Sequence, residues 1–223
     1  MILSQLLLST TRTCNFQHVF SLTDPVWNEF LKQAWFPFIY LRQETLKRMI
    51  GTTKAGHPID DHLDLITSDV EVVIGERIGR WRTHPVLQSH YSVIEASFSH
   101  FKKQDYLSAS ALLFPRIEGV MRSHHFNDPN PTKASQKALA QSAISKAPIP
   151  LHRGSLLLPD RFERFLNERY FASFDPSNPQ ELSRNTVSHG VVPESALNRK
   201  GACLGFLILL QLVSLMPNSI KTS

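Results

Sequence analysis

The chain has 223 residues, of which 42% are hydrophobic, and this argues against disorder throughout because one large or two small domains could each bury a core. Its 24 lysines and arginines exceed its 19 aspartates and glutamates, giving a formal net charge of +5. That excess suits a local site for an anionic partner but is too small for the long phosphate-tracking surface of a nucleic-acid packaging protein.

The ends of the chain and its cysteines bear on where the protein works. Residues 1–23 lack apolar periodicity and have no positive charge before their first apolar stretch, so we expect an irregular leader and no signal peptide. The apolar run 202–216 is shorter than the roughly 20 residues that cross a bilayer, so it is predicted to be a core helix, with no membrane partner. The wide separation of Cys14 and Cys203 favours a reducing, cytoplasmic compartment.

Residues 24–82 are predicted to form a mainly helical N-terminal region. Asp24 can cap a helix, Pro25 suits its first position, and the apolar spacing continues to about Phe36. A second helix is expected over 38–50, where the following glycine should stop it.

The stretch 63–78 is ambiguous, since its many β-branched residues fit either a strand or a helix. Its charges at regular intervals and its helical neighbours favour a helix.

Residues 83–217 are predicted to form a helical bundle, followed by a tail at 218–223. Within it, 85–122 has apolar residues at three- and four-residue steps, which indicates two antiparallel helices, the second kinked by Pro115. The Asn-, Pro-, Ser- and Ala-rich stretch 127–150 is interpreted as a mobile loop with an exposed helix near its centre.

Two more helix starts precede the C-terminal run. The helix of 156–174 is expected to begin with a capping box made by Asp160 and Glu163. A short helix should run from Pro179 to about His189, and a final helix from about residue 195 should bury the apolar run.

Three polar residues of the short helix form the candidate catalytic group: Arg184, Asn185 and His189. Histidine titrates near neutral pH and can take a proton from a ribose 2′-hydroxyl or give one to a leaving 5′-oxygen. Arginine can stabilise the charge on a pentacovalent phosphate, and the asparagine could donate to a non-bridging oxygen or orient the imidazole. Attack by the 2′-hydroxyl needs no metal or other cofactor and would leave a 2′,3′-cyclic phosphate.

Five positions along a regular helix correspond to about 140° of rotation, so Arg184 and His189 would not share one face. Three arrangements stay open: a distorted helix end, a long reach by the arginine, or completion of the pair by a second copy across a dimer axis.

The stretch Arg184-Asn185-Thr186-Val187-Ser188-His189, placed just before a strongly apolar terminal helix, resembles the signature of HEPN-domain proteins. The resemblance covers roughly 85–216. It implies a helical bundle that dimerises so that two motifs meet in one cleft. Many members are metal-independent endoribonucleases of toxin–antitoxin, abortive-infection and other defence systems. By this resemblance, Arg184 and His189 would be catalytic and Asn185 supporting, with RNA as substrate and an antitoxin or regulatory protein as a possible partner.

Alternatives accompany each of these assignments. Glu118 could point to the bundle centre and orient Arg184 or His189, or it could pair on the surface with Arg122, four residues on. The arginine and the histidine could also be an ordinary pair at a helix C-terminus, where the macrodipole favours positive charge. The rival to a ribonuclease is a non-catalytic all-α module for dimerisation or for binding RNA or a protein partner.

Overall fold

The computed structural model describes residues 22–126, 134–145, 157–177 and 182–215, and every regular element in these ranges is helical. The prediction of an all-α fold is confirmed for them. The α-helices are α3 (Asp24–Lys32), α4 (Gln43–Lys54), α5 (Leu63–Trp81), α6 (Tyr91–Lys102), α7 (Tyr106–Phe126), α8 (Gln136–Ser145), α9 (Leu157–Phe165), α10 (Arg184–Ser188) and α11 (Arg199–Leu215). Shorter turns are the 3-10 segments η1 (Ile59–His62), η2 (Gln88–His90) and η5 (Glu194–Ala196), and the π-helical turn η4 (Leu166–Tyr170).

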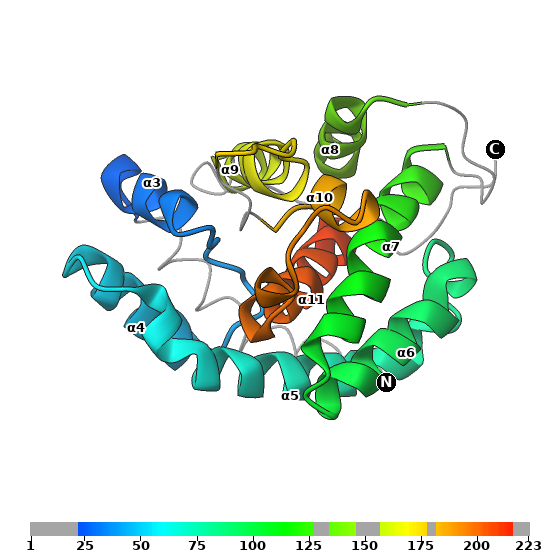
Figure 1. Ribbon diagram of the computed structural model, residues 1–223, viewed down its shortest axis with the longest axis horizontal. Helices are drawn as coiled ribbons and strands as arrows, with labels where there is room; N and C mark the ends of the chain where they lie inside the picture. Colours follow the sequence, from blue (N-terminus) through cyan, green and yellow to red (C-terminus); the bar gives the residue numbers. More distant parts are fainter. Residues whose placement is uncertain (1–21, 127–133, 146–156, 178–181, 216–223) are drawn as a thin grey trace, which may run out of the picture.

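Helix α11 lies at the centre of the molecule, and α5, α7 and α8 pack around it (Figure 1). Its residues from Gly201 to Leu212 are all buried. Phe206 contacts the rings of Phe98 and Phe101 on α6 at centroid distances of 5.8 and 5.2 Å. The apolar run is therefore a core helix, and in the described part of the chain no helix has the length and hydropathy to cross a membrane.

The N-terminal helices share this core. Phe36 and Phe38, which follow α3, contact the rings of Phe162 and Phe165 on α9 at centroid distances of 5.1 to 6.5 Å. A single cluster of buried apolar residues extends from Leu22 to the end of α11. The two regions expected from the sequence are thus joined by one hydrophobic core.

Two predicted helix boundaries in this region are wrong. The first helix ends at Lys32 rather than Phe36, and Ala34 then adopts a left-handed conformation with φ 56°. The second begins at Gln43 and continues past Gly51 to Lys54. Gly51 is exposed in mid-helix, and the left-handed turn is made instead by Gly56, with φ 75°.

The stretch 63–78, which the sequence left ambiguous, forms helix α5. Ile66, Val70 and Ile74 recur every four residues and are fully buried, so helical packing against α11 outweighs the β-branched composition. The predicted hairpin is also present as α6 and α7, which lie against each other, and α7 continues through the exposed Pro115.

The interpretation of residues 127–150 needs correction. Their centre forms α8, and this helix is not exposed, because Leu139, Ala140, Ala143 and Ile144 are buried against α7, α9 and α11. Small alanine side chains let the helix approach its neighbours closely, so few large residues are needed. The flanking parts, 127–133 and 146–150, lie outside the described residues.

The helix after this segment begins at Leu157, four residues earlier than a capping box with Asp160 as its N-cap requires. Asp160 is therefore inside the helix and exposed, and the capping-box prediction is wrong. The helix widens into the π turn η4 instead of running to Phe174. The Tyr170 hydroxyl donates to the Phe114 carbonyl at 2.6 Å, which fastens η4 to α7.

Candidate functional site

The helix that carries the motif is shorter than predicted. Asn178 and Pro179 lie outside the described residues, but Ser183 is extended, with φ −136° and ψ 167°, so α10 begins only at Arg184. The Ser183 hydroxyl accepts from the Thr186 amide at 3.2 Å, and the Thr186 hydroxyl accepts from the Ser183 amide at 2.9 Å. This reciprocal cap satisfies two backbone donors and fixes where the helix starts.

Arg184 consequently occupies the first position of α10, and its interpretation as part of a C-terminal pair is wrong. A cation at a helix N-terminus is disfavoured by the macrodipole, so another charge must hold it there. That charge is the Glu118 carboxylate of α7, which forms an ion pair with the Arg184 guanidinium. Glu118 also accepts from Arg122 Nη2 at 2.5 Å and Nε at 2.7 Å.

These three side chains form a buried charge cluster, which we call the Glu118 cluster: Glu118, Arg122 and Arg184. The Glu118 side chain is 4% exposed and each arginine 24% exposed. Glu118 therefore contacts both Arg184 and Arg122, but from a buried position and not on the surface. One carboxylate facing two guanidiniums leaves the cluster with a formal charge of +1, and a partly buried positive charge of this kind attracts an anion.

Asn185 is held by neighbours within the chain. Its amide nitrogen donates to the Phe171 carbonyl at 2.8 Å and, at 3.3 Å each, to the Ala172 carbonyl and to Gln136 Oε1. Its Oδ1 accepts from Gln136 Nε2 at 2.7 Å and from Arg184 Nη1 at 3.1 Å. The side chain thus ties α10 to α8 and to the end of η4, and it positions Arg184.

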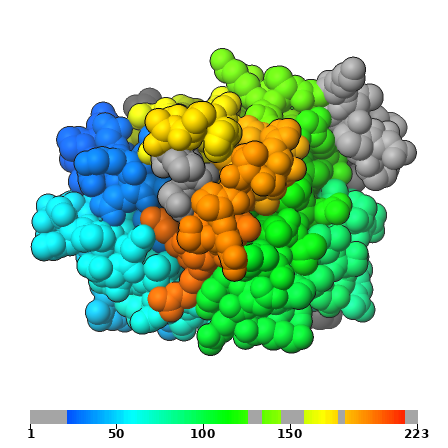
Figure 2. Space-filling model, in the orientation of Figure 1, coloured from blue at the N-terminus to red at the C-terminus, as the bar shows by residue number. Residues whose placement is uncertain are grey.

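His189 lies at the opposite end of α10 and has an exposed side chain. Its backbone amide donates to the Asn185 carbonyl at 3.0 Å, and Gly190, with φ 66°, ends the helix as predicted. Within the described residues its imidazole has no hydrogen bond, including none with Arg184. The α10 segment forms part of the molecular surface beside α7, as the orange and green regions of Figure 2 show.

The structure therefore brings together Arg184, Asn185 and Glu118, and leaves His189 separate. The arrangement offers one fixed guanidinium with excess positive charge and one imidazole open to solvent. The guanidinium can bind a phosphate and the imidazole can transfer a proton, but the two side chains do not contact each other within one chain. Among the described residues, no group of three or more His, Cys, Asp or Glu side chains is placed to hold a metal ion.

Sequence reasoning missed two residues that hold the site, Ser183 and Gln136. The spacing of Ser183 and Thr186 is a recognisable capping pattern, but the proline at position 179 suggested an earlier start. Gln136 carries no sequence signal, because it lies 49 positions from Asn185 and belongs to a stretch interpreted as a loop.

In comparisons with known proteins, no family model matches the chain, and no curated protein or solved structure matches it significantly. A functional conclusion must therefore come from the chemistry of the site.

Proposed function

We propose that this protein is a metal-independent endoribonuclease of the HEPN type that acts as a homodimer. The observation that carries the proposal is the arginine fixed by Glu118 and Asn185 on the same short helix as an exposed histidine. A rigid cation and a solvent-exposed imidazole are the two groups that metal-free cleavage of RNA requires.

In this reaction the ribose 2′-oxygen attacks the adjacent phosphorus, and the bond from phosphorus to the 5′-oxygen breaks. His189 of one copy takes the 2′-hydroxyl proton, and His189 of the partner subunit donates a proton to the leaving 5′-oxygen. Arg184 stabilises the negative charge of the pentacovalent phosphate. Asn185 is assigned a positioning role, because its amide already has internal partners. The products are a 2′,3′-cyclic phosphate and a free 5′-hydroxyl.

The requirement for two copies follows from the separation of Arg184 and His189 along α10. An exposed large apolar side chain, Val191, lies three residues after the end of α10. Figure 2 displays α7 and α10 on one face, which is the face we assign to the dimer. Sedimentation analysis of a Val191→Asp variant tests it, and a dimer unaffected by this substitution contradicts the assignment.

The test of activity is an RNA-cleavage assay in EDTA that compares the parent protein with His189→Ala. We expect the parent to produce fragments with 2′,3′-cyclic phosphate ends and His189→Ala to fold normally but lose cleavage by a factor of 100 or more, on the order of general acid–base catalysis. His100→Ala, a change of a partly exposed histidine on α6, is the matched control and should cleave like the parent. Equal cleavage by His189→Ala and the parent would refute the role of His189.

A second candidate is a non-catalytic module that binds RNA or a protein partner through the same face. The engagement of every Asn185 amide donor inside the chain favours it, since no amide donor is left for a phosphate. This candidate predicts that the folded parent retards RNA in a gel at low salt but yields no fragments at any pH. A regulatory protein such as an antitoxin would then act on binding rather than on cleavage.

A further inference from the structure

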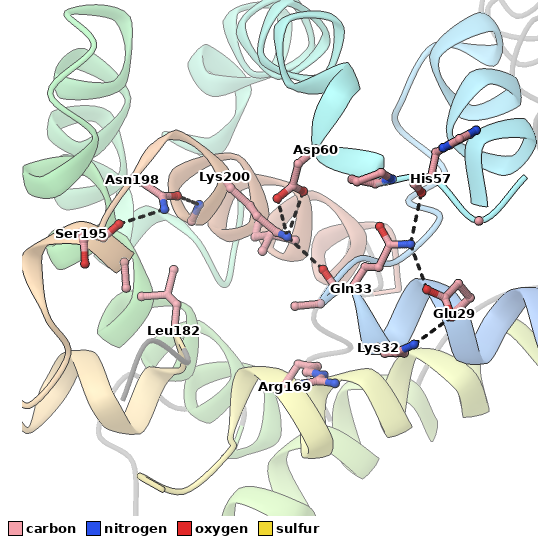
Figure 3. A pocket seen from close by; sticks show the side chains of 16 residues that line it. Glu29, Lys32, Gln33, His57, Asp60, Arg169, Leu182, Ser195, Asn198 and Lys200 are labelled. Atoms are coloured by element: carbon pink, nitrogen blue, oxygen red, sulfur yellow. Dashed lines mark hydrogen bonds and ion pairs between the residues drawn. The ribbon is translucent and has the colours of Figure 1, made fainter. Parts of the chain in front are cut away.

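A cavity of about 650 Å³ opens between the end of α3, the turn before η1 and the residues on both sides of α10 (Figure 3). Its lysines have one carboxylate each. Lys200 Nζ lies 2.9 Å from Asp60 Oδ1. Lys32 Nζ lies 3.7 Å from Glu29 Oε2. The Glu118 cluster is built differently, because two guanidiniums there share one carboxylate, and it is therefore the better place to look for an anionic ligand.

The two guanidiniums of the Glu118 cluster come from different helices and use different oxygens of the carboxylate. Arg122 on α7 donates from Nε and Nη2 to Glu118 Oε1 at 2.7 and 2.5 Å. Arg184, at the start of α10, forms its ion pair with Oε2 through Nε. Each guanidinium thus occupies one side of the carboxylate, and neither has a second acidic partner within the described residues.

Both arginines keep donors that Glu118 does not use. Arg184 Nη1 donates to Asn185 Oδ1 at 3.1 Å, but its Nη2 has no hydrogen bond among the described residues. Arg122 Nη1 makes a long bond, of 3.5 Å, to the Ala134 carbonyl. Because a guanidinium has five N–H donors, each arginine can bind an anion without releasing Glu118.

The cluster is layered, with its negative charge beneath its positive charges. The Glu118 side chain is 4% exposed, whereas each arginine side chain is 24% exposed. Burial, and then the charge of Glu118, raise the pKa of Tyr170 well above its ordinary value, so a buried ring lies close to the carboxylate. An anion that approaches from solvent therefore meets the guanidiniums first, next to a protein interior where charge attraction is stronger than in water.

We propose that Arg122 and Arg184 together bind one phosphodiester group of RNA, while Glu118 holds both guanidiniums in place. One carboxylate and two guanidiniums sum to +1, which matches the single negative charge of a phosphodiester. A terminal phosphate carries about −1.5 to −2 at pH 7 and is matched less well. Arg184 Nη2 and Arg122 Nη1 donate to the two non-bridging oxygens. The choice of RNA rests on the proposed function, in which this phosphodiester is the one cleaved and Arg122 is a second cation on it.

Binding of a 2′-O-methyl RNA hexanucleotide, measured by fluorescence anisotropy in EDTA, tests the site apart from cleavage, because this ligand lacks the attacking 2′-hydroxyl. We expect Arg122→Gln to bind it at least about tenfold more weakly than the parent, the value of one charge-assisted hydrogen bond. Arg48→Gln changes the arginine of an exposed Glu–Arg pair with the same spacing on α4, and it should bind like the parent. Equal affinities of the two variants, or no binding by the folded parent, overturn the proposal.

Two further ligands identify the chemical group that is recognised. A methylphosphonate hexanucleotide of the same sequence has no backbone charge and should not bind. AMP, offered at the same concentration of phosphate groups, should displace little of the 2′-O-methyl RNA. Tight binding of the methylphosphonate, or full displacement by AMP, overturns the proposal, because the site would then recognise bases or a terminal phosphate.

A double variant separates a direct contact by Arg122 from an effect that passes through Arg184. If both side chains contact the phosphodiester, Arg122→Gln should weaken binding by a further threefold or more, roughly, in the Arg184→Gln protein. No further loss would mean that Arg122 acts only by positioning Arg184, and the proposal would be refuted.

Arg122→Lys decides the matter if Arg122→Gln fails to fold. Lysine keeps the charge beside Glu118 but lacks the guanidinium fork, so we expect unchanged folding and affinity reduced by about threefold or more. Parental affinity in this variant would contradict the site. A parent that binds RNA without cleaving it refutes only the nuclease activity, whereas cleavage by a parent whose affinity does not depend on Arg122 refutes only this site.

Discussion

Helices α10 and α11 are held in place by different forces. Helix α11 has 17 residues and is buried along almost its whole length, so apolar contacts with α5, α6 and α7 fix its position. Helix α10 has five residues, of which only Thr186 is buried. Polar contacts with Glu118, Gln136 and the end of η4 hold it instead.

The difference matters because an isolated helix of five residues does not form in water. The conformation of α10, and with it the direction of Arg184, depends on a few directional contacts from three other elements. Damage to α11 should unfold the protein, whereas damage to those contacts should disorganise the candidate site more than the fold.

The largest expected effect concerns α11 and the stability that its apolar contacts provide. Phe206→Ala removes a fully buried ring that contacts two others, and it should lower the free energy of unfolding by about 4 kcal/mol. Guanidinium denaturation measures the loss. Leu107→Ala, at an exposed position on α7, should change stability by less than about 0.5 kcal/mol. A loss below 1 kcal/mol for Phe206→Ala would show that α11 is less tightly packed than described.

The next effect concerns the Glu118 cluster. Glu118→Ala leaves two largely buried guanidiniums without their carboxylate and should lower the free energy of unfolding by about 3 kcal/mol. Glu44→Ala breaks the exposed pair Glu44–Arg48 with the same spacing and should cost at most about 0.5 kcal/mol. Similar losses in the two variants, measured by urea denaturation, would mean that the cluster is no more than a surface pair.

A smaller effect is expected when the amide that positions α10 is removed. Asn185→Ala deletes the bonds to Gln136 and to the Phe171 carbonyl, for a loss of about 2 kcal/mol. Amide hydrogen exchange should accelerate in 184–188 but not in α11. Ser188→Ala, at an exposed position of the same helix, is the control. Uniform acceleration across both helices would contradict their independence.

The smallest effect is a pH dependence that arises where His90 of η2 contacts α7. His90 Nδ1 faces Arg116 Nη1 at 3.4 Å, and because arginine only donates, this nitrogen accepts and Nε2–H donates to the Ser123 hydroxyl at 2.9 Å. Burial, and then the charge of Arg116, lower the pKa of His90 from 6.5 to about 4.

Since the unfolded chain binds this proton below pH 6.5 and the folded chain does not until about pH 4, stability should fall as the pH drops through that window. The contribution is roughly 1 kcal/mol per pH unit, absent above pH 6.5. Denaturation of the parent and of His90→Gln at pH 7 and pH 5 measures it. An equal loss of stability in both proteins would exclude His90 as the source.

Sequence patterns predicted those parts of the fold that depend on repeated apolar spacing. The α6–α7 hairpin could be predicted because its apolar residues recur at three- and four-residue steps, and the terminal helix because its sequence is apolar almost throughout. The pattern misled where small residues do the packing, as in α8, where two of the four buried apolar positions are alanines. It also misled at Gly51, because a residue that permits a helix boundary does not require one.

By itself, then, the sequence determined that this protein is helical, that 202–215 belongs to its core, and that Arg184, Asn185 and His189 occur together beside that core. The reason is that helical periodicity and residue chemistry are local properties. Only the tertiary structure decided that Glu118 faces Arg184, that Gln136 and η4 hold Asn185, and that the N-terminal turns close a charged cavity against both ends of the motif segment. Those contacts join residues tens of positions apart, and their geometry is set by how the helices pack rather than by any spacing along the chain.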